Sequence, residues 1–245
     1  MDRIDKILAH EGFGSRKDIR KMLRSCEVLV NGKQIYDPGT QIDTEKDLIT
    51  VDGEEVNLHT HIYLMMNKPQ HTISSNKDGE HTTVFELLED NLRTPYLQEK
   101  LHLVGRLDMD TEGMLLFTTD GELTHRLISP KSHISKTYLC CLEHPETDAH
   151  KAQITEQFKA GIEVGPEDNE AGFTCEPAEI KWIDDSTAHL TIYEGKYHQV
   201  KRMFVAVGNK IVYLKRLSMG QLKLDEALEP GEYKFLEDED LAKLV

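Results

Sequence analysis

The sequence predicts an α+β protein made of two parts, a small domain over residues 1–58 and a larger domain over residues 62–245 that is built on a mainly antiparallel sheet. Three observations predict this class. At about 150 residues per domain, a chain of 245 residues allows one large domain or two unequal ones. Strand patterns outnumber helix patterns, and the irregular lengths of their connections disfavour a regular βαβ winding. The mainly polar stretch 57–61 has the composition of a linker between the two parts.

The overall composition is that of a folded protein of the cytoplasm. Hydrophobic residues make up 38% of the chain and charged residues 30%, which excludes a wholly disordered or fibrous protein. The longest apolar runs, such as Ile62–Met66, span about five residues, whereas a membrane helix needs roughly 20. Residues 1–16 lack the apolar region of a secretory signal. We expect reduced thiols rather than disulfides or a zinc site, because no C-x-x-C pair occurs among Cys26, Cys140, Cys141 and Cys175.

The first elements are two short helices. Apolar residues at helical spacing predict a helix that ends at two glycines, and these positions are Ile4, Ile7, Leu8, Gly12 and Gly14. Ser15 is then placed to cap a second helix, with Asp18 at its third position. Its apolar stripe consists of Ile19, Met22 and Leu23. Another face is cationic, because arginines recur every four residues at Arg16, Arg20 and Arg24.

Short hairpin strands follow near residues 28–30 and 48–51, with turns at Asn31-Gly32 and Asp52-Gly53. In the larger part, period-2 patterns predict strands at Ile62–Met66, Leu101–Val104, Leu115–Thr118, Lys136–Leu142, Ile180–Ile183, Ala188–Ile192 and Ile211–Leu214. Helical patterns predict helices at Val84–Leu88, Glu122–Ile128, Asp148–Phe158 and Gln199–Val207. The first of these has a capping-box spacing, from Thr83 to Glu86.

The distribution of charge is uneven. Lys and Arg total 29 against 44 Asp and Glu, a net charge of −15, which argues against nonspecific attraction to nucleic acid. Two segments depart from this average. The first, residues 16–24, holds one acid, Asp18, and the cations Arg16, Lys17, Arg20, Lys21 and Arg24. The second, residues 195–224, holds no acid and the cations Lys196, Lys201, Arg202, Lys210, Lys215, Arg216 and Lys223.

An acidic, glycine-bounded loop over residues 105–113 is the densest candidate site. Its three carboxylates, Asp108, Asp110 and Glu112, repel one another and favour a nearby cation or metal, although a solvated turn is the simpler interpretation. The spacing resembles the start of a calcium-binding EF-hand loop. That comparison fails at the twelfth position, where Thr119 stands in place of a bidentate glutamate.

Two further segments could contribute to the same chemistry. In residues 194–204 the apolar stripe leaves Lys201 and Arg202 on the exposed or cleft-facing side of a helix, although solvated cations are common. In Lys136-Thr137-Tyr138-Leu139 the tyrosine lies on a predicted strand, where aromatic residues usually serve packing. An aromatic face can also hold a base that has left its stack.

Together these motifs resemble the RsuA-type ribosomal RNA pseudouridine synthases over nearly the whole chain. Residues 1–58 resemble an S4 RNA-binding domain through Gly14-Ser15-Arg16-Lys17, Val30-Asn31-Gly32-Lys33 and Asp37-Pro38-Gly39. The larger part resembles the family's catalytic domain through Asn67-Lys68-Pro69, Gly105-Arg106-Leu107-Asp108 with Thr111 and Gly113, the K-x-Y of Lys136 and Tyr138, and His198-Gln199-Val200-Lys201. The family often has arginine where this chain has Lys201, so a point charge replaces a planar fork.

The resemblance implies an isomerase that converts a uridine of ribosomal RNA, in the 16S small-subunit RNA, to pseudouridine. It implies Asp108 as the catalytic aspartate, with Lys201 as its basic partner and Tyr138 stacking on the flipped uracil. The RNA contacts expected are Arg16, Lys17, Arg20, Lys21, Arg24, Arg106, Lys136 and Arg202. No cofactor or metal is expected, because the reaction needs none and the phosphate-loop, dinucleotide and H-E-x-x-H motifs are absent. The expected partner is ribosomal RNA or a ribosomal assembly intermediate, bound by a monomer.

Three alternatives stay open. A related branch of the family acts on large-subunit RNA and shares these motifs. A catalytically silent RNA-binding protein would show affinity without product. A metal-dependent nuclease or hydrolase could also use the acidic loop, but its activity would be lost in chelator.

Overall fold

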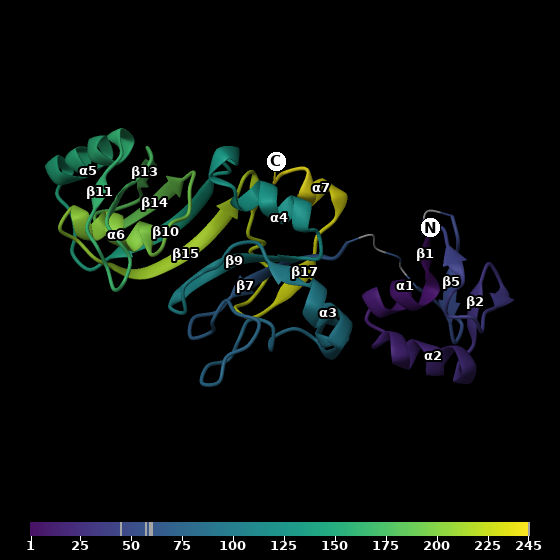
Figure 1. Cartoon of the computed structure of the whole chain (residues 1–245). Coiled ribbons are helices and arrows are strands. Elements are labelled where there is room, and N and C mark those ends of the chain that lie inside the picture. Colours follow the sequence, from purple (N-terminus) through teal and green to yellow (C-terminus); the bar gives the residue numbers. More distant parts are fainter. Residues whose placement is uncertain (45, 57, 59–60, 245) are drawn as a thin grey trace. The chain divides into compact units, whose positions relative to one another are not determined.

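The computed structural model describes residues 1–44, 46–56, 58 and 61–244 (Figure 1). These fall into two compact units. The first combines Met1–Ile62 with Phe85–His102, and the second combines Tyr63–Val84 with Leu103–Val245. Of the predicted linker, residues 57, 59 and 60 lie outside the described residues.

The first unit contains the two predicted short helices. They are α1 (Ile4–His10) and α2 (Arg16–Ser25), and α2 begins with the predicted cap. The Ser15 hydroxyl accepts the Asp18 backbone N–H, and the Asp18 carboxylate accepts the Ser15 N–H, which satisfies two donors that the helix start leaves open. Ile19 and Leu23 are buried in a core with the apolar residues of α1, so the predicted stripe is confirmed.

Small strands complete the first unit. They are β1 (Asp2–Arg3), β2 (Val28–Val30), β3 (Lys33–Gln34), β4 (Gln41–Ile42), β5 (Ile49–Val51) and β6 (Glu54–Glu55). β2, β3, β5 and β6 form one antiparallel sheet in the order β3-β2-β5-β6, as the two predicted turns require, and β1 pairs with β4. A 3-10 helix at Asp90–Arg93 and α3 (Pro95–Lys100) belong to the same unit.

The helix predicted at Val84–Leu88 is wrong. Thr83 instead forms an isolated bridge with Ile73, and the residues after it make turns, with the Leu88 N–H donating to the Phe85 carbonyl. A five-residue pattern is too short to form a helix by itself, because the first helical turn is costly to nucleate. Pairing with the segment around Ile73, ten residues earlier in the chain, instead holds Thr83 in this bridge, and the Val84 N–H donates to the Ile73 carbonyl.

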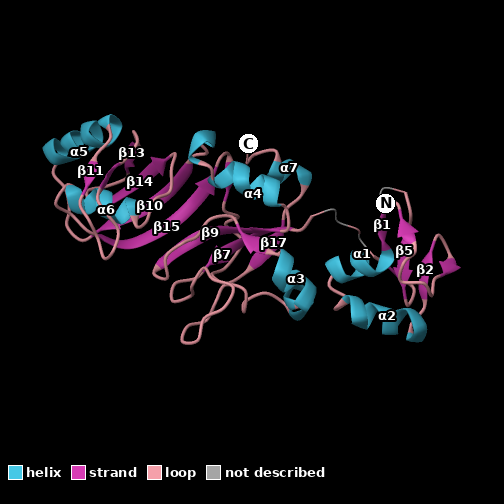
Figure 2. Ribbon diagram, in the orientation of Figure 1, coloured by secondary structure: helices cyan, strands magenta, loops and turns pink. Residues whose placement is uncertain are grey.

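A large sheet dominates the second unit (Figure 2). Its strand order is β13-β14-β10-β15-β9-β7-β17, and all neighbours on this path are antiparallel except β9 and β15. The strands are β7 (Tyr63–Lys68), β9 (Thr111–Thr118), β10 (Lys136–Leu142), β13 (Glu179–Trp182), β14 (Thr187–Ile192), β15 (Ile211–Met219) and β17 (Tyr233–Phe235), with β8 (His102–Leu103) and β16 (Leu222–Lys223) attached at β9 and β15. A separate hairpin joins β11 (Glu163–Val164) to β12 (Phe173–Thr174). The predicted α+β class with a mainly antiparallel sheet is confirmed.

Of the predicted strands, β9 and β15 extend furthest beyond their predicted limits, and both extensions lie at the site described below. β9 begins at Thr111 rather than Leu115, and β15 runs to Met219 rather than Leu214. The added residues of β9 pair in parallel with β15, Thr111 with Leu214 and Gly113 with Arg216. This approach requires glycine, because a Cβ on Gly113 would lie 2.2 Å from the Arg216 carbonyl oxygen.

Helices pack on the large sheet at both of its ends (Figure 1). They are α4 (Gly121–Ile128), α5 (Asp148–Ala160), α6 (Gln199–Ala206) and α7 (Asp238–Leu241), and a 3-10 turn covers Pro130–Ser132. α5 and α6 pack against each other through an edge-to-face contact of the Phe158 and Phe204 rings, 5.4 Å between centroids. None of the helices in the described part of the chain has the length and apolar character to cross a membrane.

Candidate active site

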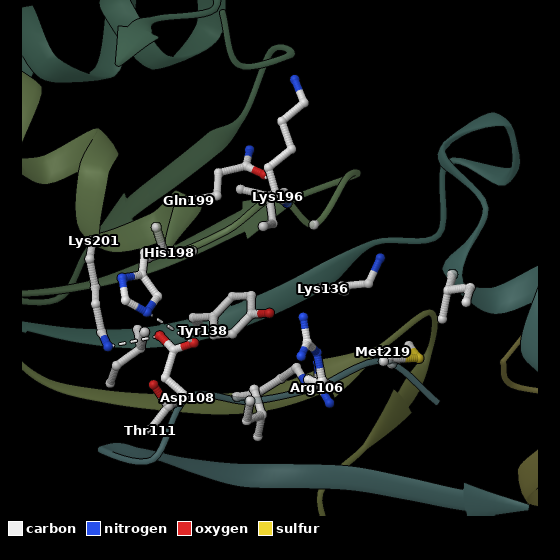
Figure 3. Close-up of a pocket in the computed structure, with 18 of the residues that line it drawn as sticks. Arg106, Asp108, Thr111, Lys136, Tyr138, Lys196, His198, Gln199, Lys201 and Met219 are labelled. Carbon is white, nitrogen blue, oxygen red and sulfur yellow. Dashed lines mark hydrogen bonds and ion pairs between the residues drawn. The ribbon is translucent and has the colours of Figure 1, made fainter. Parts of the chain in front are cut away.

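The acidic loop, β9, β10, α6 and β15 surround a pocket in the second unit (Figure 3). Its volume is about 140 Å³. A cavity of roughly 150 Å³ holds a benzene molecule, so the pocket has room for one six-membered ring. Asp108, Tyr138 and Lys201, the residues that the sequence resemblance implied for catalysis, all line it. The structure brings these three residues together, although they come from three separate elements.

Backbone contacts on both sides hold the loop that carries Asp108. The Ser74 hydroxyl bonds the Leu107 backbone, accepting its N–H at 3.1 Å and reaching its carbonyl at 2.7 Å. The fully buried Lys68 donates to the carbonyls of Pro69, Met109 and Thr111 at 3.0, 3.4 and 2.9 Å. Burial lowers the pKa of Lys68 to about 8, although the carboxylates of the loop oppose this shift. The loop is thus fixed through its main chain, which leaves the Asp108 carboxylate available to the pocket.

The cation that this loop favours is Lys201, on α6. Its ammonium donates to an oxygen of Asp108 at 2.8 Å and to one of Asp110 at 2.6 Å. Burial opposes the charge of Lys201, but the two carboxylates outweigh that effect and raise its pKa. Burial raises the pKa of Asp110, but the Lys201 ammonium lowers it by more. The pKa of Asp110 is therefore below its usual value. Lys201 therefore remains charged and keeps two adjacent carboxylates in place.

The third acid of the loop does not share this cation. Glu112 lies on β9 and accepts the Tyr213 hydroxyl at 2.6 Å. Asp108 and Asp110 contact Lys201 while Glu112 bonds a tyrosine, so the three carboxylates do not converge on one ion. In the described part of the chain, no group of three His, Cys, Asp or Glu side chains is arranged to hold a metal.

His198 is a site residue to which sequence reasoning gave no role. Its Nε2 lies 3.7 Å from Asp108, on the carboxylate oxygen that Lys201 does not use, and its Nδ1 lies 3.2 Å from Glu167. The imidazole stacks on the Tyr197 ring with centroids 3.8 Å apart. The sequence did contain a feature that could have predicted its role. His198 stands three residues before Lys201 in the same motif, and this spacing puts both side chains on one side of a helix start.

Tyr138 and two of the predicted RNA-binding cations also reach the pocket. Tyr138 lies on β10 opposite Arg216 of β15, and its side chain is buried. Arg106 is exposed where it lines the pocket, whereas Lys136 is buried. Burial, with a smaller effect of the Arg216 charge, lowers the pKa of Lys136 to about 8.

Arg202 corrects an expectation. It was predicted on the exposed or cleft-facing side of α6, but it is buried and does not line the pocket. Its guanidinium donates to the carbonyls of Gly165 and Ala171 at 2.5 and 2.8 Å and lies over the Phe173 ring at 4.4 Å. The β11–β12 hairpin, which the sequence patterns did not predict, covers this side of the helix. Arg202 therefore fixes that hairpin to α6, and its burial contradicts the predicted RNA contact.

The remaining predicted cations lie on α2 in the first unit. Arg16, Lys17, Arg20, Lys21 and Arg24 are all exposed. Arg16 differs from the others, because its guanidinium donates at 2.9 Å to Asp5, a fully buried carboxylate that Arg3 also contacts at 3.0 Å. One of the five cations thus also stabilises the packing of α1 on α2.

Both parts of the chain match known protein families. Residues 62–206 match the RNA pseudouridylate synthase family, and residues 2–49 match the S4 domain. An uncharacterized RNA pseudouridine synthase of Bacillus subtilis, YtzG, is 45% identical over 98% of this chain and 96% of its own length. Ribosomal small subunit pseudouridine synthase A of Vibrio cholerae is 41% identical over 99% of both chains. A crystal structure of a pseudouridylate synthase, 39% identical over 100% of both chains, aligns with a TM-score of 0.66.

The family match covers more than half of the chain, and the relatives align with it almost from end to end. The chain is therefore a member of the RNA pseudouridine synthase family, similar over its full length to ribosomal small subunit pseudouridine synthase A and carrying an S4 domain before its catalytic domain.

Proposed function

We propose that this protein converts a uridine of small-subunit, 16S, ribosomal RNA to pseudouridine. The observation that carries the proposal is the Asp108 carboxylate, which is held by Lys201 in the wall of a pocket that has room for one six-membered ring. Full-length relatives that are small subunit pseudouridine synthases favour the small subunit. The proposed partner is ribosomal RNA or an assembly intermediate, the proposed place of action is the cytoplasm, and the protein acts as a monomer with residues 1–58 and 62–245 as its two domains.

The reaction breaks the bond between N1 of uracil and C1′ of the ribose and joins C5 of the same base to C1′. The C5 proton leaves and N1 gains a proton, so no redox equivalent is consumed. Asp108 supplies the negative charge at the junction of ribose and base, as nucleophile or as counter-charge to the developing positive ribose. Lys201 keeps that carboxylate oriented before the substrate arrives.

The target base must leave its stack to reach this pocket. Extrusion costs a few kcal/mol, which new contacts have to offset. Tyr138 offers a face on which the uracil can stack and stands where it can assist loss of the C5 proton. The exposed Arg106 holds the strand from which the uridine has left.

The S4-like domain has a separate role in this proposal. The exposed cations of α2 neutralise phosphates and orient the RNA without reading its bases. The acidic remainder of the chain, with its net charge of −15, disfavours contact with RNA elsewhere on the surface.

The test is the Asp108→Asn variant, assayed by release of tritium from C5-labelled uridine in ribosomal RNA. We expect turnover to disappear while RNA binding and the thermal melting curve are retained. Substantial turnover by this variant would remove Asp108 from its role. Mapping pseudouridine in ribosomal RNA from cells with and without the protein then decides the subunit, because loss of a large-subunit site would contradict the 16S assignment.

A further inference from the structure

Two buried cations form part of the pocket wall. Lys136 on β10 is 9% exposed, and Arg216 on the neighbouring strand β15 is 2% exposed. Both line the pocket, and Arg216 pairs in register with Tyr138, two residues along β10 from Lys136. Lysine and arginine are rarely buried to this degree unless they are paired with an acid.

The contacts of these two cations are few and neutral. The Lys136 ammonium donates to the Ile134 carbonyl at 3.2 Å, and the Arg216 Nε donates to the Met114 carbonyl at 2.7 Å. The Nη2 of Arg216 is buried and has no hydrogen-bond partner among the described residues. The charge that contributes to lowering the pKa of Lys136 is the like charge of Arg216. An arrangement of this kind is costly unless an anion arrives to complete it.

Other cations of this unit pair with carboxylates. Lys201 contacts two carboxylates, and Lys196 lies 2.8 Å from Glu194. Among the described residues that line the pocket, Asp108 is the one carboxylate, and Lys201 already holds it. The pocket of this acidic protein is therefore cationic, and the excess charge lies at Arg106, Lys136 and Arg216.

The positive charges of Arg106 and Lys136 lie away from the Asp108 carboxylate. Figure 3 shows Asp108, His198 and Lys201 together at one end of the pocket, Arg106 and Lys136 at the other, and Tyr138 between them. A ligand that spans this distance must present a negative group at the second end. Uracil and ribose are neutral at pH 7, so in a nucleotide that group is the phosphate.

We propose that Lys136 and Arg216 form an anion subsite that binds a phosphate of the target nucleotide while its uracil faces Tyr138 and Asp108. This inference rests on the proposed function, because it takes a uridine nucleotide as the ligand. The enzyme would thereby make a contact with a nucleotide that free uracil or a nucleoside, which lack a phosphate, cannot make. This contact fixes which end of the nucleotide approaches Asp108.

The test compares binding of uridine 5′-monophosphate, uridine 3′-monophosphate and uridine to the full chain by calorimetry. We expect one monophosphate to bind roughly tenfold to hundredfold more tightly than uridine, the range of a charge-assisted hydrogen bond. Lys136→Met should remove this preference and leave the affinity for uridine unchanged. Inorganic phosphate should compete with the monophosphate in the wild type and not in the variant.

The matched control is Lys215→Met. Lys215 also lies on β15, next to Arg216, but it projects from the opposite face and does not line the pocket. This variant should keep the full preference for the monophosphate. Because Arg216 also supports β9, it is tested by the conservative Arg216→Lys variant, with a melting curve to confirm the fold.

Two results would overturn the subsite. One is an unchanged preference in Lys136→Met, and the other is an equal loss of affinity for uridine and its monophosphate, which would place the cation on the base. The tritium-release assay separates this outcome from failure of the proposed function. Turnover without phosphate preference refutes the subsite alone, whereas phosphate preference with full turnover by Asp108→Asn refutes the role of Asp108 alone.

Discussion

Removing the Lys201 ammonium should strongly impair catalysis, because it is the cation that holds Asp108. Lys201→Met deletes a charge-assisted contact of 2.8 Å to a carboxylate whose side chain is 32% exposed. Such a hydrogen bond contributes about 1.5 to 3 kcal/mol. The second contact adds little, because the Asp110 side chain is 68% exposed and water screens the pair. At about 1.4 kcal/mol per factor of ten, the expected loss in kcat/KM is roughly tenfold to hundredfold.

The conservative variant sharpens this test. In Lys201→Arg the charge is retained, and a planar guanidinium offers several donors to two neighbouring carboxylates. We therefore expect most of the activity to return, as the frequent arginine at this position in the family implies. Failure of Lys201→Arg together with Lys201→Met would mean that the shape of the ammonium, and not its charge, is needed.

The assay is tritium release under single-turnover conditions, which separates the chemical step from RNA binding. The loss should fall on the rate of the step, since Lys201 is occupied by carboxylates and not free for RNA. Lys210→Met, an exposed cation of the same basic segment, serves as the control for a lost positive charge. Wild-type single-turnover rates in Lys201→Met would refute the reasoning.

Three further outcomes follow from the same structure. Replacing Arg20 and Arg24 of α2 by alanine should reduce the salt dependence of RNA binding by about one unit of slope per lost phosphate contact, and an unchanged slope would count against that helix as an RNA contact. Gly113→Ala should lower the melting temperature sharply, because its Cβ would stand 2.2 Å from a carbonyl oxygen of β15, whereas Gly79→Ala, with open space around it, should not. Affinity for uridine monophosphate should fall as pH rises through about 8, because buried Lys136 loses its proton there. The phosphate titrates near pH 6 and stays charged in this range, so it does not cause the fall. Lys136→Arg should abolish the fall.

Local sequence patterns predicted those elements whose own residues decide their conformation. The cap at Ser15 and the stripe of Ile19 and Leu23 mark α2 in the local sequence, and packing of that stripe against α1 completes it. The alternation along residues 136–142 likewise gave β10 its observed limits. In both cases the same residues that form the element also bury its apolar face.

Long-range pairing and burial explain what the patterns missed. The parallel pairing of Gly113 with Arg216 joins segments a hundred residues apart, so no local signal marks the extended ends of β9 and β15. Arg202 and Arg216 look like ordinary surface cations in the sequence, yet both are buried by elements that arrive from elsewhere. The catalytic candidates were predicted because their motifs match a family, whereas the unpaired charge of Arg216 could be recognised only once its surroundings were in place.

The distribution of charge within the pocket gives a reason for the direction in which a nucleotide would enter. A phosphate that approached the Asp108 end would meet a negative carboxylate. The cation at that end, Lys201, is already paired with this carboxylate. At the other end it would meet Lys136 and Arg216, which have no carboxylate to neutralise them among the described residues. Asp108 and Lys136 lie at opposite ends of the Tyr138 ring in Figure 3, and Arg216 pairs with Tyr138 from the neighbouring strand. One orientation of the nucleotide therefore places the phosphate on cations and the ribose–base junction at Asp108, whereas the reverse orientation places the phosphate beside the Asp108 carboxylate. The same two cations that destabilise the empty pocket would thus discriminate against the unproductive orientation, and this is why their removal should loosen the selection of nucleotide over nucleoside.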